Sequence, residues 1–201
     1  MKIAVFMGGT SSEKEISLRS GEAVLESLQR QGYDAYGVVL DENNQVTAFL
    51  ENDYDLAYLV LHGGNGENGK IQAVLDILGK KYTGSGVLAS ALTMDKNKTK
   101  QIAENIGIRV PKSYRDLDSI ERFPVIIKPV DEGSSKGLFL CNNKEEAGEA
   151  LKKLRKPIIE DYIVGEELTV GVLNGKALGV LKIIPQADVL YDYDSKYAKG
   201  G

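Results

Sequence analysis

The stretch FPVIIKPVDEGSSKGLFL, residues 123–140, carries the clearest structural signal in the chain. A β-branched run ends at Lys128, a polar loop with two glycines follows, and a second apolar run leaves the loop. This pattern predicts a strand, a flexible loop and another strand. Gly133 and Gly137 let the loop fold back so that its N–H groups face an anion, and Lys128 adds an ammonium. We interpret it as a nucleotide site on a hairpin flap, although an ordinary hairpin with a solvated lysine fits the pattern equally well.

The composition of the whole chain predicts a globular protein of one or two domains. Of its 201 residues 42% are apolar, and the formal net charge is −4. We expect no nucleic-acid partner, because no basic surface is predicted, and no membrane span, because no apolar run is long enough. Cys141 is the single cysteine, so an intrachain disulfide is excluded, which favours a reducing cytoplasm.

The first half of the chain alternates strands and helices. We expect strands at residues 3–7, 34–40 and 55–61, and helices from Ser12 to Gly32 and over residues 69–78. Ser12 and Glu15 have capping-box spacing, and Gly21 is the small residue on the apolar face of the first helix. This order predicts an open parallel sheet, whose ligands bind beyond the carboxyl ends of its strands.

Two residues at those strand ends are candidates for chemistry. Glu13 lies in the first turn of the first helix, where it either complements the helix dipole or faces the cleft to hold a substrate ammonium. His62 follows the third strand and precedes two glycines. It is either a packed histidine or a ligand contact, and its position at the strand end favours the ligand contact.

The second half of the chain predicts an α+β domain. A short strand and turn at residues 81–86 separate it from the first half. We expect helices ending at Gly107 and over residues 144–154, strands at 157–163, 166–173 and 176–184, and an Asn174-Gly175 turn. Lys96, Lys98 and Lys100 also fit a solvated charge run. Residues 187–201 are polar, rich in tyrosine, and predict a surface loop that stops at Gly201.

In this order, these segments resemble the D-alanine–D-alanine ligases of the ATP-grasp family. The matching stretches are 8–17, 61–63, 82–86, 94–96, 127–129, 132–135, 159–167, 191–193 and 196–197. The resemblance implies an α/β protein with a Rossmann-like, pre-ATP-grasp domain followed by an α+β ATP-grasp domain whose C-terminal part is incomplete. We expect an N-terminal substrate domain at residues 1–84, a central ATP-binding subdomain at 85–163 and the start of the C-terminal subdomain at 164–201.

The resemblance also implies a reaction. ATP phosphorylates the carboxylate of one D-alanine, and the amine of a second D-alanine attacks the acyl phosphate. The product, D-alanyl-D-alanine, is a peptidoglycan precursor made in the bacterial cytoplasm. ATP and Mg²⁺ are the implied cofactors, D-alanine is the implied substrate, and a homodimer is the implied assembly.

The family's functional residues can be matched to positions of this sequence. Glu13 and His62 match the site of the first D-alanine, Ser134 and Ser135 lie on the flap, and Tyr197 matches a loop tyrosine that joins Glu13 and Ser134 in one network. The implied ATP contacts are Lys96, Lys128, Glu132, Ser134, Ser135, Glu160, Asp161, Ile163, Glu167 and Lys196. The lysines neutralise charge on the phosphates, the segment around Glu160 reads adenine, and Glu167 holds the ribose.

Two departures from the family pattern leave alternatives open. Lys136 stands where many relatives have an aliphatic residue. No segment matches the family's arginine or its Mg²⁺ ligands, so we expect no metal-binding residues in this chain. A catalytically incomplete fragment that binds nucleotide or D-alanine is therefore one alternative. Another ATP-grasp carboxylate–amine ligase is a second, although the flap and the tyrosine loop argue against it.

Overall fold

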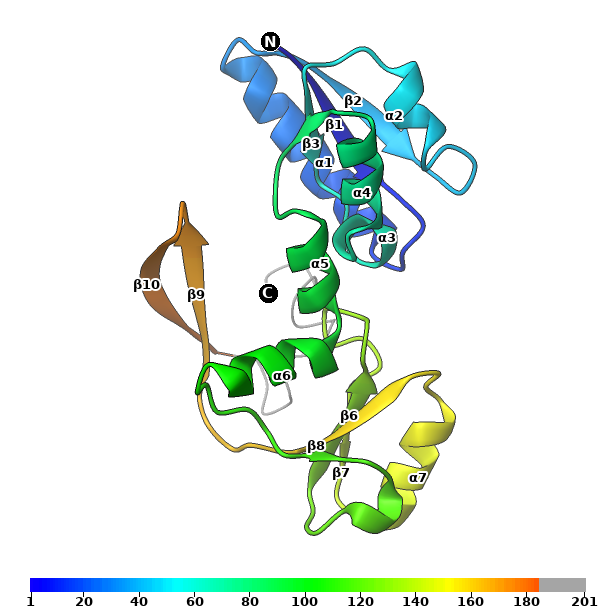
Figure 1. The fold of residues 1–201 in the computed structure, drawn as a ribbon, viewed down its shortest axis with the longest axis vertical. Coiled ribbons are helices and arrows are strands. Elements are labelled where there is room, and N and C mark those ends of the chain that lie inside the picture. Colours follow the sequence, from blue (N-terminus) through cyan, green and yellow to red (C-terminus); the bar gives the residue numbers. More distant parts are fainter. Residues whose placement is uncertain (185–201) are drawn as a thin grey trace. The chain divides into compact units, whose positions relative to one another are not determined.

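The computed structural model describes residues 1–184 of the chain (Figure 1). Contacts within the chain separate two units, Met1–Ile106 and a second unit that begins at Gly107. This division lies downstream of the predicted boundary after residue 84, so the helix predicted to end at Gly107 groups with the first unit. The three-part division at residues 84 and 163 remains a prediction. Among the described residues, no helix is long and apolar enough to cross a membrane.

The first unit contains a four-stranded parallel sheet in the order β2-β1-β3-β4. Its strands are β1 (Lys2–Gly8), β2 (Asp34–Leu40), β3 (Leu56–Leu59) and β4 (Lys81–Tyr82). Its helices are α1 (Lys14–Arg30), α2 (Thr47–Glu51), α3 (Gly64–Glu67), α4 (Lys70–Ile77), α5 (Val87–Met94) and α6 (Lys96–Asn105). The predicted parallel sheet is confirmed.

Side chains alternate across the central strand β1, so helices cover both faces of the sheet. Ile3, Val5 and Met7 pack against Leu25 and other apolar residues of α1. Phe6, on the opposite face, lies in a core with residues of α2 and α4. This two-sided burial explains why β1 is an almost uninterrupted apolar run.

Gly21 is required where α1 crosses β1. A Cβ atom at Gly21 would lie 2.5 Å from Cβ of Met7, much closer than a normal contact. The helix therefore approaches the sheet more closely than any side chain would allow. The interpretation of Gly21 as the small residue of the buried face is confirmed.

One local prediction in this unit is wrong, and two short helices were not predicted. The residue that caps α1 is Glu13, and its side chain forms no capping hydrogen bond, so the predicted capping box of Ser12 and Glu15 is wrong. The short helices α2 and α3 lie in segments where no element was predicted. Both have only four or five residues, too few to show a helical repeat in the sequence.

The second unit contains an antiparallel sheet in the order β5-β8-β6-β7, with helix α7 against one face. Its elements are β5 (Ser113–Tyr114), the 3₁₀ helix η1 (Leu117–Ser119), β6 (Val125–Pro129), β7 (Phe139–Cys141), α7 (Lys144–Lys152) and β8 (Pro157–Asp161). The predicted strand, flap and strand are confirmed, because β6 pairs with β7 through Ile126 and Leu140. Cys141 is buried in the core under α7.

A separate hairpin follows, formed by β9 (Glu167–Leu173) and β10 (Lys176–Ile183). Asn174 and Gly175 connect the strands with φ angles of 48° and 74°, as the two central residues of a type I′ turn require. The predicted Asn-Gly hairpin is confirmed. The predicted surface loop at residues 187–201, with Lys196 and Tyr197, lies outside the described residues.

Candidate functional site

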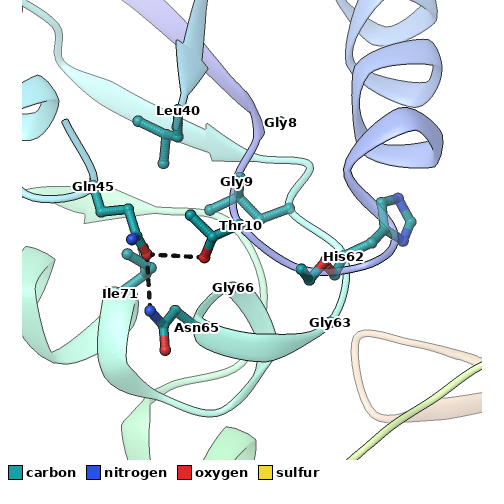
Figure 2. Close-up of a pocket in the computed structure, with 12 residues that line it drawn as sticks. Gly8, Gly9, Thr10, Leu40, Gln45, His62, Gly63, Asn65, Gly66 and Ile71 are labelled. Atoms are coloured by element: carbon teal, nitrogen blue, oxygen red, sulfur yellow. Dashed lines mark hydrogen bonds between the residues drawn. The ribbon is translucent and has the colours of Figure 1, made fainter. Parts of the chain in front are cut away.

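A pocket opens at the carboxyl ends of β1 and β3, where the open-sheet rule placed it (Figure 2). Its lining consists of Gly8, Gly9, Thr10, Ser11, Leu40, Gln45, Leu61, His62, Gly63, Asn65, Gly66 and Ile71. The buried hydroxyl of Ser17 ties these strand ends together, because it accepts from the N–H of Gly8 at 2.8 Å and donates to the carbonyl of Val60 at 2.6 Å. The two strand ends from which the loops with Glu13 and His62 begin are therefore held together.

Ser11 links the two predicted substrate residues. Its hydroxyl donates a hydrogen bond to the carbonyl oxygen of His62 and accepts one from the N–H of Glu13 at 3.1 Å. The carboxylate of Glu13 is largely buried and lies beside Gly63, where an added Cβ would come within 2.6 Å of Oε2. The structure thus brings Glu13 and His62 together, although they are far apart in the sequence.

A second polar link joins the same loops and was not predicted from the sequence. The Oε1 atom of Gln45 accepts hydrogen bonds from Nδ2 of Asn65 at 2.8 Å and from Oγ1 of Thr10 at 3.5 Å (Figure 2). Gln45 lies between β2 and α2, in a stretch without a motif. Only the fold shows that this glutamine reaches the pocket.

In the second unit, Lys128 and Glu160 form an ion pair on neighbouring strands. In the register of β6 and β8, Ile126 faces Glu160 and Lys128 faces Ile158, so the two charged side chains lie diagonally on one face. Their Nζ and Oε2 atoms are 2.6 Å apart, and Glu160 is 3% exposed against 26% for Lys128. Because Ile159 packs under α7, this charged pair lies on the opposite face of the sheet. A buried carboxylate thus holds the ammonium of the strand that leads into the flap.

Two serines of the flap have backbone conformations that are rare for residues other than glycine. Ser134 and Ser135 both have left-handed φ angles, 51° and 56°, and the N–H of Lys136 donates to the carbonyl of Gly133 at 3.1 Å. Non-glycine residues in this region are strained by about 1–2 kcal/mol each. Such strain is found mainly at ligand clamps and switch regions. The position of both serines is therefore consistent with a functional loop.

Asp161 holds the end of β8 in place. Its carboxylate accepts hydrogen bonds from the Tyr114 hydroxyl at 2.7 Å and from the Arg122 guanidinium. The guanidinium, and after it the hydroxyl, hold the pKa of Asp161 below its ordinary value. The N–H of Asp161 also donates to the carbonyl of Lys112 at 2.9 Å. The N–H of Tyr162 also donates to a main-chain carbonyl, so the N–H groups of both residues already have partners, and the reading of adenine by this segment remains a prediction.

The remaining predicted residues are spread over both units. Ile163 is 59% exposed and lies between β8 and β9, Glu132 is exposed on the flap, and Glu167 is the exposed first residue of β9. Lys96 begins α6 in the first unit, after the N-cap Asp95, whose side chain accepts from the N–H of Lys98. Their roles toward ATP remain predictions.

The described residues fit the two implied cofactors differently. For ATP, they provide a strand-end lysine held by a buried carboxylate beside a flap with a strained backbone. For a metal, residues 1–184 contain no group of three or more His, Cys, Asp or Glu side chains that could hold an ion.

Family models match almost the whole chain. The model described as D-ala D-ala ligase N-terminus matches residues 2–50 and 44–85, and the model described as D-ala D-ala ligase C-terminus matches residues 81–201. The chain is 88% identical over 201 residues to the D-alanine--D-alanine ligase of Fusobacterium nucleatum, and it covers 70% of that protein. It is 42% identical over 211 residues to the enzyme of the same name from Aquifex aeolicus, of which it covers 72%.

Solved structures give the same result. A D-alanine--D-alanine ligase from Bacillus anthracis matches 98% of this chain with a TM-score of 0.85 and 35% identity, and 68% of its own length is covered. A structure of the Bacillus anthracis enzyme complexed with ATP matches 91% of this chain with a TM-score of 0.81 and 33% identity, over 66% of its own length. The implied fold class is confirmed, and the chain belongs to the D-alanine–D-alanine ligase family.

Proposed function

We propose that this protein joins two D-alanine molecules to D-alanyl-D-alanine at the expense of ATP, for peptidoglycan precursor synthesis. The first D-alanine binds at the carboxyl ends of β1 and β3. When bound, ATP supplies the phosphoryl group that activates the carboxylate of this D-alanine. The amine of the second D-alanine then displaces phosphate from the acyl phosphate, so one C–N bond forms and one C–O bond breaks.

The observation that carries this proposal is the joining of Glu13 and His62 by the Ser11 hydroxyl. A largely buried carboxylate attracts an ammonium group much more strongly than a solvated one, since little water screens the charge. Glu13 therefore holds the ammonium of the first D-alanine, and His62 lies near its carboxylate. By joining the main chains of the two residues, the Ser11 hydroxyl helps to set the spacing that an α-amino acid requires.

The second unit supplies contacts for ATP. Lys128 neutralises phosphate charge, and its pairing with Glu160 fixes the position of the ammonium before ATP arrives. The flap contacts ATP through Glu132, Ser134 and Ser135. The segment from Glu160 to Ile163 contacts adenine, and Glu167 holds the ribose. Lys96 contributes a second charge to the phosphates.

Other parts of the proposal rest on the family resemblance alone. Mg²⁺ accompanies ATP, and Lys196 approaches the phosphates. Tyr197 forms a hydrogen-bond network with Glu13 and Ser134 when its loop closes. The protein acts in the cytoplasm as a homodimer, without nucleic acid or membrane partners.

The test is ADP release by the purified protein with Mg-ATP and either D-alanine or L-alanine. We expect release only with D-alanine, together with one D-alanyl-D-alanine for each ADP. The chain spans about 70% of the length of the curated relatives it matches. Binding of D-alanine and of ATP is therefore measured separately from turnover, by the shift in melting temperature.

Each outcome separates one alternative. D-alanine that raises the melting temperature without ADP release would favour the second candidate, a unit that binds D-alanine and nucleotide without turnover. ADP release that depends on a different carboxylate and amine would favour another ATP-grasp ligase. No response to D-alanine in either assay would overturn the proposal.

A further inference from the structure

We infer that Ser11 is a positioning residue, whose hydroxyl sets the distance between Glu13 and His62 and thereby the affinity for the first D-alanine. The inference rests on the proposed function and extends it to a residue without a predicted role. Ser11 itself needs no contact with the substrate. It acts through the main chain of the two residues that do.

The evidence is the geometry of one hydroxyl with two partners on different loops. The Oγ atom of Ser11 donates to the carbonyl oxygen of His62, beyond β3, and accepts from the N–H of Glu13, at the start of α1, at 3.1 Å. A serine hydroxyl has one donor and two acceptor positions, so both bonds can form at once. The loops after β1 and β3 therefore meet at one oxygen atom.

Two glycines of the loop after β3 lie close to Ser11. A Cβ atom at Gly63 would lie 3.3 Å from both Cβ and Oγ of Ser11, and one at Gly64 would lie 3.4 Å from its Cβ. The backbone of these two glycines therefore lies close to Ser11. Gly63 also lies beside the Glu13 carboxylate, so it is close to both Ser11 and Glu13.

The neighbouring serine provides a matched control. Ser12 is exposed, and Ser12→Ala removes a hydroxyl group from the same loop while the two Ser11 hydrogen bonds stay in place. Ser11→Ala removes both hydrogen bonds and leaves the His62 carbonyl and the Glu13 N–H without this partner. A misplacement of about 1 Å in a group that holds the substrate can cost on the order of a hundredfold in rate.

His62 also provides the probe, because it is the only histidine of the chain. Its imidazole protons give an NMR signal that needs no assignment. We expect Ser11→Ala to shift that signal without any ligand, and to raise the dissociation constant for D-alanine about tenfold, while the constant for ATP stays unchanged. Ser12→Ala should match the wild type in all three measurements. Ser11→Thr, which keeps the hydroxyl, should restore most of the D-alanine affinity.

The inference and the proposed function fail in different ways. If Ser11→Ala moves the His62 signal but the wild type does not bind D-alanine, the link between the loops holds and the substrate is wrong. If Ser11→Ala and Ser12→Ala give the same His62 signal and the same D-alanine affinity, the inference is overturned. Should Ser11→Ala fail to fold, Ser11→Cys, a weaker donor of similar size, decides by the same two readouts.

Discussion

Replacing Gly63 by alanine should damage D-alanine binding far more than it damages the fold. The new Cβ would lie 2.6 Å from Oε2 of Glu13, whereas an ordinary contact begins at 3.4 Å. The carboxylate must therefore retreat by about 0.8 Å. Because a misplacement of about 1 Å can cost on the order of a hundredfold, we expect kcat/KM for D-alanine to fall by roughly that factor. The KM for ATP should not change.

Backbone strain is the competing explanation, and the chain offers a control for it. Gly63 has a φ angle of 65°, where alanine costs about 1–2 kcal/mol. Gly79 has nearly the same angle, 63°, and a Cβ atom there would meet nothing within 4 Å. Gly79→Ala should therefore lower the melting temperature as much as Gly63→Ala does, with D-alanine kinetics unchanged. Equal D-alanine kinetics in the two variants would refute the reasoning.

Three further predictions address the second unit and the core. Lys128→Ala should lower turnover about a hundredfold or more by removing charge stabilisation from the phosphates, and an unchanged kcat would contradict this role. Asp161→Asn should lower the urea midpoint at pH 7, and this deficit should shrink as the pH falls below about 3.9, because a carboxylate with a depressed pKa stabilises the fold above its unfolded pKa and loses this effect as the pH falls through its folded pKa. A deficit that does not shrink as the pH falls would exclude the charge as the cause. Gly21→Ala should destabilise the protein by about 1–3 kcal/mol through overpacking against Met7, whereas Gly148→Ala in α7, with no heavy atom nearer than 3.8 Å, should stabilise it by about 0.5–1 kcal/mol. Melting temperatures that move in the same direction would contradict the close-approach argument.

Strong local patterns in the sequence predicted most of the fold. The β-branched run before Lys128 and the Asn174-Gly175 dipeptide identified two hairpins, and alternating strands and helices identified the parallel sheet. These signals succeed because each depends on residues that are neighbours in the chain. The capping box at Ser12 failed, since spacing alone does not show whether the backbone turns where the cap requires it.

The sequence could not show how the candidate site is held together. Ser11 and His62, or Gln45 and Asn65, meet only because parallel strands bring separate loops to one edge of the sheet. The pairing of Lys128 with Glu160 likewise depends on the register of two antiparallel strands. Such contacts join residues that no periodicity relates, so they emerge only from the three-dimensional structure.

The most direct test of the central claim compares Glu13→Gln with Glu15→Gln. Both replacements remove one negative charge from the start of α1, but Glu13 is buried at the pocket loops and Glu15 is exposed. We measure the KM for the first D-alanine and for ATP in each variant. The account predicts a KM for D-alanine raised at least tenfold in Glu13→Gln alone, with the KM for ATP unchanged. A change confined to ATP, or equal effects of the two variants, would contradict it.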